Sequence, residues 1–162
     1  MPSRILVSLR VAATAERAFE SFTGEIGQWW RPNGLFRFTP GDPGTLRFEP
    51  GPGGRLTETQ SDGRLFEIGR IKVWQPPARL VFNWRQASFT PAQETEVHVS
   101  FEPVGHETRV TVEHLGWDAV PAEHVARHGF PDAIFLRRHA EWWRSLLHSL
   151  ALLLARGNAG AG

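Results

Sequence analysis

A histidine at position 114 has the placement in this sequence that best suits chemistry. From Val110 onward apolar and polar residues alternate, so Val110, Val112 and His114 share the covered face of a predicted strand. A buried imidazole needs hydrogen-bond partners for its ring nitrogens. The pattern leaves three roles open: a core histidine bonded to a backbone carbonyl, a polar anchor in a ligand pocket, or a general acid or base. His114 is the one catalytic candidate.

The aromatic composition indicates an apolar binding site. The chain has seven tryptophans and eleven phenylalanines but no tyrosine. A cavity lined by such side chains would suit flat or aliphatic ligands, because buried apolar area contributes about 25 cal/mol per Å². Most of these rings are expected to be core. Five tryptophans, at a short helix, a sheet end, a crossing loop and the closing helix, are predicted near the pocket mouth: Trp29, Trp30, Trp84, Trp117 and Trp143.

Metal and cofactor chemistry is not indicated by the other histidines. In the segment AEHVARH, Glu123 precedes His124, and His128 follows four residues later, with His139 as the nearest third histidine. The zinc-protease motif needs a glutamate directly after the first histidine, which is missing. The chain has no cysteine, and no Ser-His-Asp set, phosphate loop or dinucleotide fingerprint occurs. We expect no metal site and no cofactor.

Three charged residues lie on strands whose phase is ambiguous. Glu58, Glu67 and Arg70 could each face inward, although such residues usually lie on the solvated face of a sheet.

A long amphipathic helix from Phe135 to Arg156 must hold the site together. Its apolar residues recur at steps of three and four, while charged residues occupy the opposite side. Pro131 and Asp132 supply a start signal, and Gly157 with Asn158 supplies a stop. At about 1.5 Å per residue the helix is roughly 33 Å long, and it needs a large apolar surface to pack on.

The pattern of the remaining residues predicts an antiparallel sheet, which would supply the apolar surface on which the helix packs. A strand around Ile5–Val11 precedes two short helices, and about six strands follow up to Leu115, separated by turns rich in glycine and proline. An antiparallel sheet with one apolar face and one long helix across it is an α+β architecture. We expect a single domain over residues 1–157 and a flexible tail over 158–162.

Charge and hydropathy exclude two partner classes. Eighteen basic and seventeen acidic residues leave a net charge of +1 with no clustered basic face, which argues against nucleic acid. The longest uncharged stretch is about half of what spans a bilayer, and no signal-peptide core is present. We expect a cytoplasmic protein. A homodimer through an edge strand is compatible with the pattern, but nothing selects it.

Several motifs in this order resemble the START-like (SRPBCC) superfamily, and within it proteins similar to the carboxy-terminal domain of the activator of the heat-shock-chaperone ATPase. They are AERAFESFTGEIGQWWRP, GPGGRLTE with DGRLFEIGRI, WQPPARLVFNW, TEVHVSFEP with HETRVTVEHLGW, and the closing helix. The resemblance implies a helix-grip fold, in which a curved sheet of six or seven strands wraps the long helix around an apolar cavity. It also implies a small hydrophobic ligand. The predicted ligand-binding residues are Trp29, Trp30, Phe36, Phe38, Phe82, Trp84, Val112, His114, Trp117, Trp143 and Leu147.

Three function classes follow. The leading hypothesis is a binding module for a small hydrophobic molecule, with the segment Ala119–Ala133 as a movable cover. The first alternative is a cyclase or aromatase acting on a polyketide-like substrate, with His114 as its acid or base. The second is a chaperone-associated, stress-related interaction protein. The activator carries a separate amino-terminal domain that is not found here, which argues against a chaperone partner.

Overall fold

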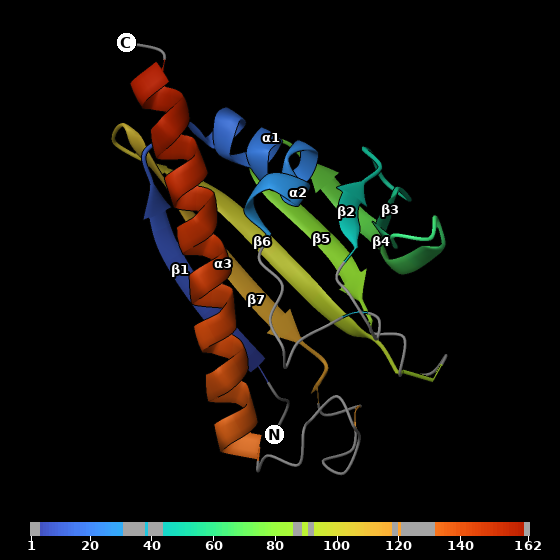
Figure 1. Ribbon diagram of the computed structural model, residues 1–162. Coiled ribbons are helices and arrows are strands. Elements are labelled where there is room, and N and C mark those ends of the chain that lie inside the picture. Colours follow the sequence, from blue (N-terminus) through green and yellow to red (C-terminus); the bar gives the residue numbers. More distant parts are fainter. Residues whose placement is uncertain are drawn as a thin grey trace.

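The architecture is one curled antiparallel sheet that holds a long helix against its inner face (Figure 1). The computed structural model describes residues 4–30, 38, 44–85, 89–90, 93–117, 120 and 132–160. The strands are β1 (Arg4–Val11), β2 (Thr45–Phe48), β3 (Arg55–Thr59), β4 (Leu65–Gln75), β5 (Arg79–Trp84), β6 (Thr95–Val104) and β7 (Glu107–Leu115). The helices are α1 (Ala15–Gly24), α2 (Ile26–Trp29) and α3 (Asp132–Gly160). This is the helix-grip α+β fold predicted from the sequence.

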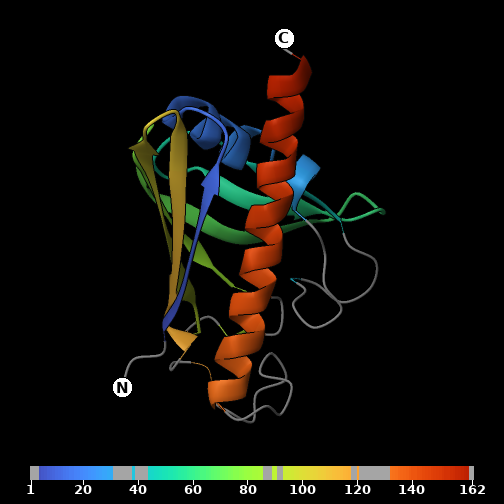
Figure 2. The same cartoon turned by 90° about the vertical axis from the view of Figure 1, so that its left-hand side faces the viewer.

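The seven strands pair in the order β1-β7-β6-β5-β4-β3-β2, with every pairing antiparallel. The register places apolar residues in rows across the inner face. One row runs from Phe82 through Val97 and His114 to Ile5. Irregular pairing in β3 and β4 marks two bulges, and bulges bend a sheet and increase its twist. The sheet therefore curls around the helix (Figure 2).

Helix α3 closes the open side of the sheet and runs along β1 (Figure 2). Its inward side chains are fully or almost fully buried, whereas Arg137, Arg144 and His148 are exposed on the outer side, as the helical periodicity predicts. The helix begins at Asp132, which confirms the start signal. The predicted stop at Gly157 and Asn158 is wrong, because the helix continues to Gly160. Glycine permits a left-handed cap without requiring one, and inside a helix it costs only about 1 kcal/mol.

Helices α1 and α2 fill the end of the sheet near β2 and β6 (Figure 1). Thr14 caps α1, because its hydroxyl oxygen accepts a hydrogen bond from the Arg17 N–H at 3.2 Å. Phe19 and Phe22 then face inward and are buried. The turn from α1 into α2 leaves Trp29 in the core with its indole N–H bonded to the Ser21 carbonyl at 3.0 Å.

The Thr14 cap leads to a stability prediction. Replacing Thr14 with alanine removes an acceptor for the first turn of α1 and is expected to lower the free energy of unfolding by about 1 kcal/mol. Urea denaturation followed by circular dichroism measures the change. Thr14→Ser keeps the hydroxyl and is the matched control. An equal loss in both variants would show that the methyl group, and not the cap, is responsible.

Candidate ligand-binding site

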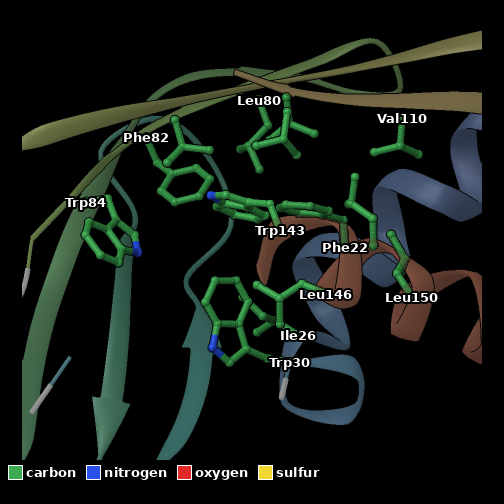
Figure 3. Close-up of a cluster of buried hydrophobic side chains, with 14 of the residues drawn as sticks. Phe22, Ile26, Trp30, Leu80, Phe82, Trp84, Val110, Trp143, Leu146 and Leu150 are labelled. Carbon is green, nitrogen blue, oxygen red and sulfur yellow. The ribbon is translucent and has the colours of Figure 1, made fainter. Parts of the chain in front are cut away.

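The predicted ligand-binding residues come together between the sheet and α3. Phe82 and Trp84 come from β5, Val112 and His114 from β7, and Trp143 and Leu147 from α3. Figure 3 shows Trp143 projecting from α3 toward Leu80 and Phe82 on the sheet. Trp29, Trp30, Phe38 and Trp117 join the same buried cluster. Phe36 lies outside the described residues.

Four aromatic rings form the centre of this region, and we call them the four-ring cluster: Trp84, His114, Trp117 and His139. Every pair among them is in contact, with ring centroids 4.9 to 5.8 Å apart. Trp84 ends β5, His114 is near the end of β7, Trp117 follows β7, and His139 is on α3. All four side chains have no exposed surface. Most pairs are edge-to-face, the geometry that aromatic quadrupoles favour.

The hydrogen bonds of His114 define its protonation state. The Thr95 hydroxyl donates to the Trp84 carbonyl at 2.8 Å, so its oxygen is left to accept from His114 Nε2–H at 2.7 Å. On the other side of the ring, Trp143 Nε1–H donates to His114 Nδ1 at 3.2 Å. His114 is therefore neutral with its proton on Nε2, and both ring nitrogens are bonded within the protein.

Burial explains why this neutral form is stable. Removing the ring from water disfavours the charged imidazolium and lowers the pKa of His114 to about 3. A histidine with such a low pKa is a poor general base near neutral pH. Of the three roles left open by the sequence, the core-histidine role implied a bond to a backbone carbonyl, whereas the observed partners of both ring nitrogens are side chains. Its role as a ligand anchor stays a prediction.

His139 is a member of the cluster, although the sequence pattern pointed to it only as the nearest third histidine for a metal site. Its ring lies against Trp84, Trp117, Phe135 and Trp142 and has no exposed surface. Burial, followed by the neighbouring His114, holds the pKa of His139 well below its usual value. A signal was present in the sequence. His139 follows Phe135 by four residues and precedes Trp143 by four, which places it on the apolar face.

Trp84 was predicted to be a ligand-binding residue, but the state of its indole N–H was not predicted. Trp29 and Trp143 each donate an indole hydrogen bond. Trp84 Nε1, by contrast, has no hydrogen-bond partner among the residues that the structure describes, although it is buried. Leaving a buried donor unsatisfied costs about 1–3 kcal/mol. The nitrogen lies on the side of the ring that faces Trp30 (Figure 3).

The three charged residues of ambiguous phase divide into two groups. Glu67 and Arg70 form an ion pair at 3.1 Å whose side chains are 39% and 61% exposed, so they lie on the solvated face. Glu58 is only 5% exposed and lies opposite Leu46 and Phe66 in the sheet. Its carboxylate accepts a hydrogen bond from the Gly44 N–H at 3.4 Å.

Two other predictions fall on parts of the chain that cannot be described. Glu123, His124 and His128 lie outside the described residues, and so does most of the predicted cover, Ala119–Ala133. Within residues 4–30, 44–85, 93–117 and 132–160, no group of three or more potential ligands could hold a metal ion. No helix in the described part of the chain is long and apolar enough to cross a membrane.

Comparison with known protein families identifies this arrangement. The family described as "Activator of Hsp90 ATPase homolog 1-like protein" matches residues 12–155. The chain belongs to this family. The START-like (SRPBCC) resemblance predicted from the sequence is thereby confirmed. No curated protein matches the chain at a significant level.

Solved structures of similar fold come from diverse sources. A Mesorhizobium loti protein has 18% identity, with 94% of this chain and 97% of that one covered and a TM-score of 0.66. An HSP90 activator from Plasmodium falciparum has 16% identity, coverage of 94% and 96%, and a TM-score of 0.66. At these identities the likeness shows the fold alone. An anthrahydroquino-γ-pyrone synthase is 31% identical, with coverage of 82% and 84% and a TM-score of 0.51.

Proposed function

We propose that this chain binds a flat, largely apolar small molecule between the inner face of its sheet and α3. The four-ring cluster is the observation that carries the proposal. The four buried rings contact one another near the end of β5, mostly edge-to-face. A planar ligand can make the same edge-to-face contacts with such rings. The fold of the family, with a sheet wrapped around one long helix, supports a ligand in this position. The expected cytoplasmic location stays a prediction.

Catalysis on an aromatic polyketide-like substrate is the second candidate function. The 31% identity to an anthrahydroquino-γ-pyrone synthase supports it. In such a reaction this chain would supply a site whose shape folds the substrate and whose apolar walls exclude water. His114 is held neutral by burial and by its two hydrogen bonds, so we expect it to orient the substrate site and not to exchange protons near neutral pH.

A ligand screen tests the binding proposal. Native mass spectrometry of freshly purified protein shows what is already bound, and a thermal-shift screen then compares polycyclic aromatics, sterols and fatty acids. At one hundred times the dissociation constant, a ligand of the native state adds about 2.7 kcal/mol, which corresponds to a rise in Tm of roughly 5–10 °C for a chain of this size. We expect the largest rise with polycyclic aromatics.

Two variants assign the response to the site. Trp117→Leu removes one ring of the four-ring cluster and should lose most of the Tm rise. Trp74→Phe is the control, because Trp74 lies against Phe19, outside the cluster, and it should keep the full rise. Recovery of the ligand unchanged in mass and absorbance indicates binding alone, whereas a changed product indicates the synthase-like function. Failure of every compound to bind, together with capture of a chaperone, would favour the interaction class instead.

A further inference from the structure

The orientation and surroundings of Trp84 restrict the chemistry of the ligand. Its indole N–H is a donor inside the core, and it has no hydrogen-bond partner among the described residues. The neighbouring polar groups are already committed to one another, because Thr95 bonds the Trp84 carbonyl and His114, and His114 also bonds Trp143. Trp84 therefore presents a donor that an incoming molecule can satisfy.

The lack of a fully buried positive charge in the described part of the chain restricts the charge of the ligand atom that could accept from the Trp84 indole N–H. No lysine or arginine residue is fully buried among the described residues, although half-buried Arg85, which follows Trp84, has an enclosed Nε atom, and His114 is neutral. A buried carboxylate without a counter-charge is strongly unfavourable, which disfavours fatty acids and other anionic ligands. A neutral oxygen, such as a carbonyl, can accept from an indole N–H without that penalty.

The aromatic rings around Trp84 restrict the shape of the ligand. Phe38, Phe89 and Trp117 contact it edge-to-face, with centroids 5.2 to 6.2 Å away. A planar ring that carries its oxygen in the ring plane could pack among such side chains and still direct that oxygen at Nε1.

We infer that the ligand is a neutral, carbonyl-bearing aromatic of quinone type, and that its carbonyl oxygen accepts a hydrogen bond from the Trp84 indole N–H. This inference rests on the proposed function, since it names the chemical class of the ligand for the same site. Trp84 then determines specificity, because its hydrogen bond gives oxygenated rings a higher affinity than hydrocarbons of the same shape.

A matched pair of probes tests the inference. Menadione, a methylated naphthoquinone, and 2-methylnaphthalene have the same ring system and differ in the two carbonyl oxygens. The chain has no cysteine, so the quinone cannot add to a thiol. Equilibrium dialysis should give wild-type protein about tenfold higher affinity for menadione, the ratio that one buried hydrogen bond supplies. Trp84→Phe should bind both probes equally, and Trp74→Phe should keep the tenfold ratio.

The outcomes separate this inference from the proposed function. Binding of both probes with equal affinity by wild-type protein would overturn the inference and leave the proposed function standing. Binding of neither probe would overturn both. Retained binding of 2-methylnaphthalene shows that Trp84→Phe is folded. As a second measurement, the ¹⁵N–¹H indole signal that disappears in Trp84→Phe should move downfield in wild-type protein with menadione and stay in place with 2-methylnaphthalene.

Discussion

Replacing Trp143 with alanine is expected to lower the free energy of unfolding by about 3–5 kcal/mol, the range for removing a large buried aromatic side chain. Trp143 has no exposed surface and lies between α3 and the sheet (Figure 3). Its loss would leave a cavity beneath the helix and would remove the donor to His114 Nδ1. Urea denaturation monitored by circular dichroism measures the change.

A conservative variant separates packing from hydrogen bonding. Trp143→Phe keeps a ring in place but removes the indole N–H, so only part of the loss is expected to remain. A double-mutant cycle with His114→Phe should show coupling of at least about 0.5 kcal/mol, because each single variant breaks the same hydrogen bond. Additive effects of the two substitutions would show that the Trp143–His114 bond does not contribute to stability.

The fold was largely predictable because its signals are local. Alternation in β5, β6 and β7, the turn at Pro76–Pro77 and the periodicity of α3 each depend on short stretches of chain. An apolar sheet face and one long amphipathic helix then allow few arrangements. The end of α3 was predicted wrongly, because Gly157 and Asn158 are compatible with a cap and with a further helical turn.

The site was predictable only in part, since its contacts depend on register and on the rotation of α3. Alternation correctly placed His114 on the inner face. Its partners could not be found in this way, because Thr95 is brought near by the pairing of β6 with β7, and Trp143 by the packing of α3. The unsatisfied donor of Trp84 is a property of the packed structure alone. His139 was the exception, because its helical spacing from Phe135 and Trp143 carried the information.

Two buried histidines also predict acid sensitivity. His114 has a pKa of about 3 in the folded protein against an ordinary value of 6.5, and the pKa of His139 is lowered in the same direction. Below pH 6.5 the unfolded chain therefore binds protons that the folded chain does not. Stability is fully present above pH 6.5 and falls by about 1.4 kcal/mol per pH unit for each such histidine, until the folded pKa is reached.

Between pH 7.5 and pH 5 the free energy of unfolding is expected to fall by about 2 kcal/mol from His114, and the lowered pKa of His139 adds to the fall in the same direction. Urea denaturation across this range measures the slope, and carboxylates contribute little because their ordinary pKa values lie near or below 4.5. His114→Phe should make the slope shallower, because it removes the contribution of His114 and leaves that of His139. His148→Gln is the control, since His148 is exposed on the outer side of α3, and it should keep the wild-type slope. A slope unchanged in His114→Phe would mean that the His114 site takes up a proton without unfolding, which the two hydrogen bonds on its ring argue against.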